Sequence, residues 1–195
     1  MAFFRTVGFS EPLPVIEGRG VFLRAPQATD FEEWAALRER SRNFLVPWEP
    51  TWPADDLSRG AFRRRIRRYA EDQRADQSYA FFIFRRDDNA LVGGLTLANV
   101  RRGVAQAGSI GYWVGEPFIR RGYMTAAVRA LVPFCFATLR LHRVEAACIP
   151  TNTASIRLLE KCGFSREGYA REYLCINGAW QDHLLYARLK DDPQG

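Results

Sequence analysis

The chain has 195 residues, 47% of them apolar and 26% charged, a composition typical of one folded globular domain and not of a disordered chain. Its net charge of +6 favours an anionic ligand or an RNA-rich neighbour, while four scattered cysteines and only two histidines argue for reduced, mostly buried thiols and against a zinc site. No apolar run approaches the roughly 18 residues of a membrane span, and the beginning MAFFRTVGFS lacks the apolar centre of a signal peptide, so we expect a cytoplasmic protein without membrane contact.

The spacing of apolar residues and the positions of turn residues predict the secondary structure. We expect a loosely patterned arm at residues 1–17, a single domain at 18–190 and a frayed tail at 191–195. In the first part of the chain we expect a strand at Gly20–Arg24, a helix to about Ser41, an ordered loop at Asn43–Pro53 and a helix at about Leu57–Gln73. Three strands follow, at Tyr79–Arg85, Leu91–Val100 and Gln106–Val114, and then a helix at Gly122–Leu139. The last elements are a strand at Arg143–Ile149, a short helix at Thr153–Cys162, and the strands Gly168–Ile176 and Ala179–Leu189, joined by the hairpin turn Asn177-Gly178.

Two features of the first half concern local structure. Thr29 and Glu32 have the spacing of a capping box, which predicts the start of the first helix. The stretch Asn43–Pro53 contains three prolines and cannot continue that helix, so we expect an ordered loop. Its two tryptophans either plug a surface groove or line one, and loops on rigid scaffolds often carry binding residues.

The helix at about Leu57–Gln73 has one apolar face and one arginine-rich face. The arginines are Arg63, Arg64, Arg65, Arg67 and Arg68. Two interpretations are open: a patch for ribosomal RNA or another acidic partner, or an ordinary solvated helix face.

The order of the elements predicts an α+β fold with a mostly antiparallel central sheet and helices on both faces. The three strands in the middle of the chain form an antiparallel meander. One neighbouring pair should be parallel, where the strand ending at Val114 and the strand beginning at Arg143 are joined by a crossover helix. We expect these two strands to splay apart and open a cleft. Pro133 should kink the crossover helix, because it removes the hydrogen bond to the carbonyl of Arg129.

The stretch Gly111–Thr125 combines a strand, a short connection and a glycine turn that opens a helix. A helix that starts in this way leaves its first N–H groups unpaired, and the helix dipole adds partial positive charge there. Gly122 lets an anion approach the backbone without meeting a Cβ. We therefore expect a phosphate site at this turn.

These features together resemble the cofactor half of the GNAT superfamily of N-acetyltransferases. Asn152, Ser155 and Lys161–Phe164 stand at the family's spacing downstream of the turn, although within the turn only Gly122 matches the family loop strictly. Further blocks resemble the RimJ/RimL ribosomal-protein alanine N-acetyltransferases, RimJ in particular: Phe44–Pro50, Asn99–Gly103, Gly111–Trp113, Glu167–Leu174 and Asn177–His183.

The resemblance implies the GNAT fold, with the sheet splayed between its two neighbouring parallel strands, and acetyl-CoA as cofactor. It also implies transfer of the acetyl group to the α-amino group of an N-terminal alanine of a small-subunit ribosomal protein, free or on the assembling ribosome. Whether the protein is a monomer or a homodimer stays open. The cofactor residues it implies are Tyr112, Trp113, Val114, Ile119, Arg120, Arg121, Gly122, Tyr123, Met124, Thr125, Asn152, Ser155, Arg157, Leu159 and Lys161.

No carboxylate is an obvious general base. Glu116 at the mouth of the splay, and Asp182 and His183 on the last hairpin, are candidates, with surface exposure or hairpin packing as the alternative for each. An α-amino group is about a tenth uncharged at pH 7 and needs little help. On the leaving side, many relatives carry a tyrosine where this chain has Leu159. The resemblance to RimL implies that Ser155, one turn earlier, stabilises or protonates the departing thiolate; ordinary hydrogen bonding at the helix start is the alternative.

For the acceptor we expect Trp48, Glu49, Asn99, Tyr112 and Tyr173 to line the cleft. Two other functions are open. An acetyltransferase for a small amine would need carboxylates, and the loop Asn43–Pro53 offers only Glu49. A basic ribosome- or RNA-binding protein would use the arginine-rich helix without catalysis.

Overall fold

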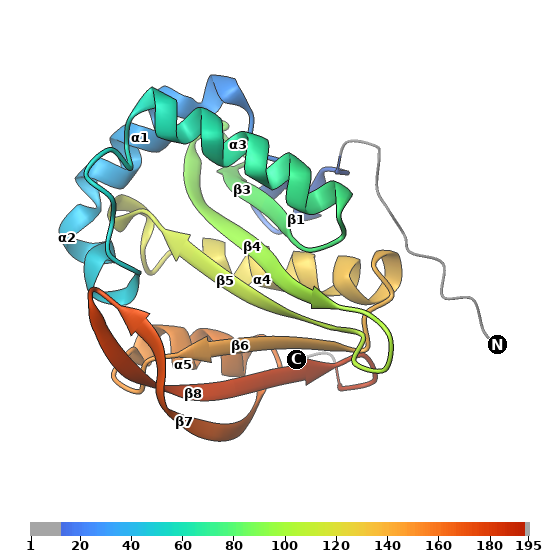
Figure 1. Cartoon of the computed structure of the whole chain (residues 1–195). Helices are drawn as coiled ribbons and strands as arrows, with labels where there is room; N and C mark the ends of the chain where they lie inside the picture. The colour runs from blue at the N-terminus through green and yellow to red at the C-terminus, as the bar shows by residue number, and fades with distance from the viewer. Residues whose placement is uncertain (1–12, 194–195) are drawn as a thin grey trace.

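The computed structural model describes residues 13–193, which fold around one eight-stranded sheet in the order β1-β2-β3-β4-β5-β6-β8-β7 (Figure 1). The strands are β1 (Ile16–Gly18), β2 (Val21–Arg24), β3 (Tyr79–Arg85), β4 (Leu91–Arg101), β5 (Ala107–Val114), β6 (Arg143–Cys148), β7 (Ser165–Ile176) and β8 (Ala179–Leu189). The helices are α1 (Phe31–Arg40), α2 (Arg42–Leu45), α3 (Arg59–Arg74), α4 (Tyr123–Pro133) and α5 (Thr153–Lys161).

The sheet confirms the predicted topology. β3, β4 and β5 form the antiparallel meander, and β5 and β6 are the parallel pair, joined through α4. The final hairpin β7–β8 is antiparallel and turns at Asn177 and Gly178, whose φ angles of 47° and 80° are those of a tight primed turn. The parallel pair matters for function, because it is the place where the sheet opens.

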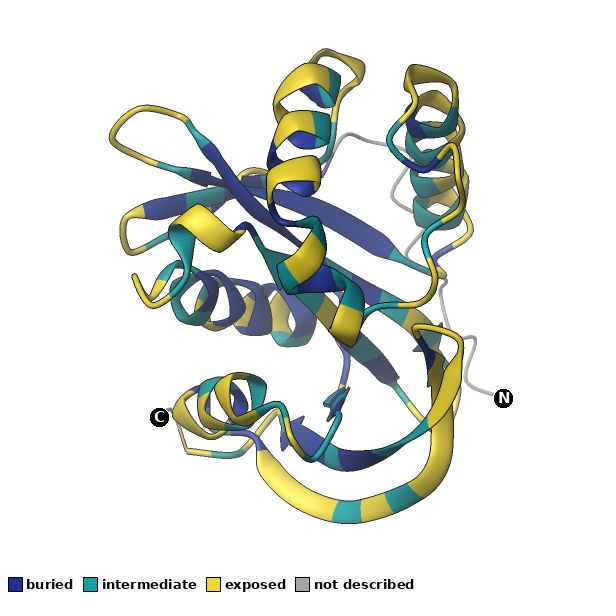
Figure 2. Cartoon of the chain, turned by 90° about the vertical axis from the view of Figure 1, so that its left-hand side faces the viewer, coloured by how far each residue is buried: buried dark blue, intermediate teal, exposed yellow. Residues whose placement is uncertain are grey.

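Helices cover both faces of the sheet and bury two clusters of apolar side chains. The larger cluster joins α4 and α5 to the sheet and includes Val128, Leu131 and Leu159. The smaller cluster lies under α1 and α3 and is built around Trp34 and Phe62, whose rings are 4.8 Å apart. Figure 2 shows the buried strands between helices whose outward faces are exposed. The cysteines in the described residues are free thiols, and all but Cys175 are buried, as the sequence predicts.

The predicted capping box of Thr29 and Glu32 is wrong. Gln27 and Asp30 form the box instead, at a short 3-10 turn just before α1. The Asp30 carboxylate accepts the Gln27 N–H at 2.7 Å and two hydrogen bonds from the Arg24 guanidinium. The charged partner on β2 fixes Asp30 at the cap, and no local spacing rule contains that partner.

The loop expected at Asn43–Pro53 begins with helical turns. Residues Arg42–Leu45 form α2, and Val46–Trp48 form a 3-10 turn. Pro47 lies in the first turn of that short helix, where the missing N–H costs no hydrogen bond. The remainder, Glu49–Pro53, is irregular as expected.

At Pro133, where the sequence predicts a kink, the structure shows a change of helix type. Residues Phe134–Thr138 continue as a π-helix, in which the Leu139 N–H donates to the carbonyl of Phe134 at 3.0 Å. Proline lacks the N–H that would close the turn before it, and a wider turn absorbs the mismatch.

The two ends of the chain are more ordered than expected where they are described. β1 lies inside the stretch expected to be an arm, because Ile16 pairs with Leu23 of β2; the arm's residues 1–12 lie outside the described residues. Asp192, in the expected tail, accepts the Leu189 N–H at 2.8 Å, and residues 194–195 lie outside the described part. Within the described residues no helix is long and apolar enough to cross a bilayer.

Candidate active site

The parallel strands β5 and β6 part at one end, as predicted. Their pairing runs from Ala107 with Arg143 to Ile110 with Ala146 and goes no further. β5 continues to Val114 along β4, so its last residues, 111–114, have strand partners on one side only. The backbone groups on the other side face an opening in the sheet, and an extended ligand can bind there as a strand would.

The turn before α4 presents unpaired N–H groups to solvent. Gly122 is the N-cap of α4, with φ of 80°, and no side chain of the described residues caps this end. The first hydrogen bond of the helix joins the Ala126 N–H to the Gly122 carbonyl at 3.0 Å, so the N–H groups of Tyr123, Met124 and Thr125 precede it.

This turn also has room for a ligand against its backbone. Arg120, Arg121 and Gly122 are exposed, and a Cβ placed on Gly122 would meet no atom within 4 Å. Arg120 has a φ of 59°, so two of these three residues adopt left-handed backbone conformations. Bare helix N–H groups, an open glycine and two arginines are the groups that a phosphate or pyrophosphate site would need.

The start of α5 places a serine hydroxyl at the splay. Asn152 caps α5 as predicted, and its side-chain oxygen accepts the Ser155 N–H at 3.1 Å. The Ser155 Oγ lies 2.6 Å from the Tyr112 hydroxyl of β5. Tyr112 lies beyond Ile110, the last residue of β5 that pairs with β6, and Ser155 lies on the helix that follows β6, so this contact joins the two sides of the opening. Burial raises the pKa of Tyr112 well above its usual range, and the phenol keeps its proton.

Two of the predicted cofactor side chains do not face the opening. Leu159 is fully buried in the main core and has no surface for a ligand. The Trp113 side chain packs with the smaller cluster under α1 and α3, whereas Tyr112 packs with the larger one. Successive residues of a strand point to opposite faces, so Trp113 can meet a cofactor in the splay only through its backbone.

The other predicted cofactor residues lie along the turn or on α5. Met124 is buried, and Tyr123 meets Phe118 edge to face with ring centroids 6.4 Å apart. Arg157 and Lys161 are exposed on α5, where charged side chains can reach an anion at the surface. Val114, Ile119 and Thr125 are half-buried.

The candidate bases are engaged differently from one another. The Glu116 N–H donates to the buried Ser41 hydroxyl at 2.9 Å, which fixes its backbone while its side chain is exposed. His183 is 3% exposed, and its Nδ1 lies 2.9 Å from the Gln181 carbonyl, so that nitrogen carries a proton. The His183 ring also meets Tyr173 edge-on, with centroids 5.7 Å apart.

Asp182 is held as a carboxylate by its own hairpin. The Tyr169 hydroxyl donates to it, and the Glu172 N–H donates at 2.8 Å. These bonds, the Tyr169 bond first, hold the pKa of Asp182 below its usual value, so this group is a weak base.

The predicted acceptor residue Glu49 is part of an ion pair that the sequence did not reveal. Arg38 of α1 donates two hydrogen bonds to its carboxylate, at 2.7 and 2.6 Å, and the Trp52 indole N–H donates a third at 2.8 Å. The Arg38 guanidinium lies between the rings of Trp52 and Trp113, 4.0 and 5.0 Å from their centroids. Trp52 also lines a groove against α3, so one of the two tryptophans of this loop lines a groove.

The tip of the last hairpin meets the loop that carries Glu49. The Asn177 N–H donates to the Glu49 carbonyl at 2.9 Å. Trp48, next to Glu49 in the chain, is 37% exposed, and Tyr173 of β7 is 47% exposed, so neither side chain is closed off from solvent. Asn99 is different, because it lies in the irregularity between Ala98 and Arg101, beside the beginning of β5. The structure therefore does not bring Asn99 to the splay.

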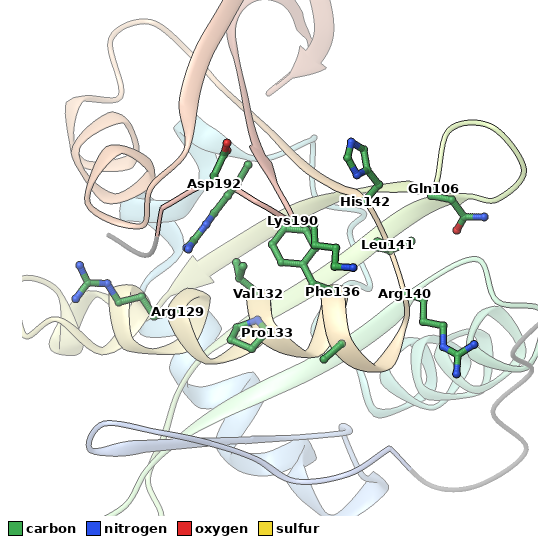
Figure 3. A pocket seen from close by; sticks show the side chains of 12 residues that line it. Gln106, Arg129, Val132, Pro133, Phe136, Arg140, Leu141, His142, Lys190 and Asp192 are labelled. Atoms are coloured by element: carbon green, nitrogen blue, oxygen red, sulfur yellow. The ribbon is translucent and has the colours of Figure 1, made fainter.

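A cavity of about 800 Å³ beside the crossover helix is a separate feature. Figure 3 shows Arg129, Arg140, His142 and Lys190 around apolar side chains of the second half of the crossover helix. The cavity is also lined by Gln106, and both Gln106 and His142 lie just before the parallel strands, so it lies at the end opposite to the splay.

The arginine-rich face of α3 is only partly neutralised. Arg64 and Arg65 form ion pairs with Asp55 and Asp56, each at 2.6 Å. The other arginines of this face, Arg63, Arg67 and Arg68, are exposed.

Comparisons with known proteins place this chain beside acetyltransferases. The family described as acetyltransferase (GNAT) domain matches residues 21–165. The probable N-acetyltransferase YjcK of Bacillus subtilis (strain 168) is 37% identical over 180 residues, which are 92% of this chain and 99% of that protein. The ribosomal protein uS5-alanine N-acetyltransferase of Escherichia coli (strain K12) is 33% identical over 165 residues, 84% of this chain and 85% of that protein. The solved structure of Mycobacterium smegmatis RimJ in complex with CoA-disulfide superimposes with a TM-score of 0.86 at 31% identity, covering 94% of this chain and 90% of that one.

Proposed function

The chain belongs to the GNAT acetyltransferase family, and we propose that it acetylates the α-amino group of an N-terminal alanine of a small-subunit ribosomal protein. It is an N-acetyltransferase of the RimJ/RimL type, and enzymes of this family take the acetyl group from acetyl-CoA. We also propose that the acceptor is a ribosomal protein and that the enzyme acts in the cytoplasm.

The cofactor would lie across the splay. Its pyrophosphate would bind the N–H groups of Tyr123, Met124 and Thr125 beside Gly122, where the helix start is open. The pantetheine arm would follow β5, with Asn152 beside it and the thioester oxygen held by a main-chain N–H near Val114. Arg120, Arg121, Arg157 and Lys161 would add positive charge for the phosphates.

In the reaction, the uncharged acceptor amine attacks the thioester carbon. The C–N bond forms, the C–S bond breaks with its electron pair on sulfur, and the proton lost by nitrogen ends on the CoA thiol. Ser155, at the splay, would donate a hydrogen bond to the departing sulfur. The enzyme needs only a weak general base at this site, because an α-amine is already partly uncharged at neutral pH.

One observation favours an α-amine over a small polycationic amine. Glu49 is the only carboxylate of the acceptor loop, and Arg38 already neutralises it through two hydrogen bonds. A site for a polyamine or an aminoglycoside needs carboxylates that are free to pair with the substrate. The similarity to the uS5-alanine acetyltransferase supports the same conclusion.

We expect the pH dependence to identify the amine. With a peptide that begins with alanine, kcat/KM should rise about tenfold per pH unit and level off near pH 8, where an α-amine loses its proton. With the same peptide carrying a blocked N-terminus and an internal lysine, any rate should continue to rise toward pH 10. Thiol release between pH 6 and pH 9 measures both.

An equal rate on the blocked peptide at pH 7 would contradict α-amine specificity, and turnover of small amines alone would favour the small-molecule alternative. A non-catalytic role for the arginine face of α3 makes a different prediction: RNA binding that weakens steeply with salt, in a protein that releases no thiol.

A further inference from the structure

Tyr112 and Ser155 meet although they are 43 positions apart in the chain. Tyr112 lies on β5 just beyond Ile110, the last residue paired with β6, and Ser155 lies in the first turn of α5. Their hydroxyl oxygens are 2.6 Å apart, a short and well-formed hydrogen bond. The bond therefore spans the opening where the thioester of acetyl-CoA would lie.

Either hydroxyl of this pair can donate, so the chemistry of the two groups indicates the direction. A serine hydroxyl has one proton and two acceptor positions, and it rotates to suit its partners. The Tyr112 phenol is desolvated, which raises its pKa and keeps it protonated. A phenol is a stronger hydrogen-bond donor and a weaker acceptor than an aliphatic hydroxyl, so we infer that Tyr112 donates to the Ser155 oxygen and leaves the serine's own O–H free to donate to a third group. The Ser155 main chain is fixed separately by Asn152.

The face of α5 that carries Ser155 continues with Leu159 one turn later. Leu159 is fully buried and has no hydroxyl. The only hydroxyl on that face of α5 in the described structure is then that of Ser155, one turn earlier. The hydroxyl proton of a serine rotates freely about the Cβ–Oγ bond, so a fixed hydrogen-bond partner is needed to set its direction.

We propose that Tyr112 is a positioning residue for the leaving group, which holds the Ser155 oxygen so that the serine proton points at the sulfur of the departing CoA. This role rests on the proposed placement of the thioester in the splay. As the C–S electron pair moves onto sulfur, Ser155 donates to it, and Tyr112 stays protonated throughout. The interaction strengthens only when sulfur gains charge, so it acts on kcat and not on cofactor binding.

The test is a double-mutant cycle with Tyr112→Phe and Ser155→Ala. Removing the Tyr112 hydroxyl should lower kcat about tenfold and leave KM for acetyl-CoA within about twofold. In the Ser155→Ala background the same change should have almost no further effect, because there is no serine to aim. Tyr186→Phe is the matched control, since Tyr186 is a buried tyrosine of the same core, and its kcat should be unchanged.

The readout excludes loss of folding and separates this inference from the proposed acceptor. Thermal unfolding and CoA affinity of Tyr112→Phe should match those of the wild type. Thiol release is measured with an alanine peptide and also with hydroxylamine, which accepts the acetyl group without a peptide site. If the wild-type enzyme acetylates hydroxylamine but not the alanine peptide, the proposed acceptor is rejected. If Tyr112→Phe has the same kcat as the wild type with hydroxylamine, the positioning role is rejected. The positioning role is also rejected if Tyr112→Phe lowers kcat by the same factor in the Ser155→Ala background as in the wild type.

Discussion

Replacing Ser155 with alanine is expected to lower kcat about a hundredfold with little change in KM for acetyl-CoA. The hydroxyl donates to a sulfur that becomes charged only as the C–S bond breaks, and removing one such donor in an acyl-transfer site costs about two to three powers of ten. Binding of the ground state does not use that charge, so the loss falls on kcat.

The substitution leaves the cap of α5 in place. Asn152 caps α5 through the Ser155 main-chain N–H, which alanine retains. Thr153→Ala is the matched control, because Thr153 is an exposed hydroxyl residue at the start of the same helix and should keep kcat within about twofold. Steady-state thiol release measures both variants. A Ser155→Ala enzyme within about twofold of the wild type would remove the serine from the mechanism.

Replacing Gly122 with valine should weaken CoA binding at least about a hundredfold. A β-branched residue at φ of 80° is strained by about 1–2 kcal/mol. Its Cβ would also project into the open space beside the first N–H groups of α4, where the pyrophosphate is expected to lie. The backbone strain should lower the stability of the folded protein, and the blocked approach to the N–H groups should lower the affinity for CoA.

Gly20 separates these two effects. It has φ of 72° and no atom within 4 Å of an added Cβ, but it lies in the turn between β1 and β2. Gly20→Val should therefore lose a similar amount of stability in thermal unfolding while binding CoA as the wild type does in calorimetry. If both variants lost affinity equally, or if Gly122→Val kept it, the turn would not be the phosphate site.

Most predictions of elements and turns were accurate, and one local prediction failed. The parallel pair, the Asn177-Gly178 hairpin and the bare helix start at Gly122 follow from apolar spacing and turn chemistry, which act over a few residues. The capping box failed because Arg24, on another element, stabilises Asp30 at the cap.

The sequence indicated the backbone features of the candidate site better than the contacts of its side chains. Tyr112 and Trp113 were both assigned to the cofactor, although neighbours on a strand face opposite sides of the sheet. That alternation was present in the sequence and could have separated them. The pairs Tyr112 with Ser155 and Arg38 with Glu49 are different, because they join separate elements and arise only when the chain is folded.

The central claim is that main-chain N–H groups at the start of α4 bind the cofactor's pyrophosphate. Amide proton–nitrogen spectra recorded during a titration with CoA test it most directly. We predict saturable binding, with the N–H signals of Tyr123, Met124 and Thr125 among the largest shifts, as expected for new hydrogen bonds to phosphate oxygens. Saturation by CoA with these three signals unmoved, or no binding at all, would contradict the claim.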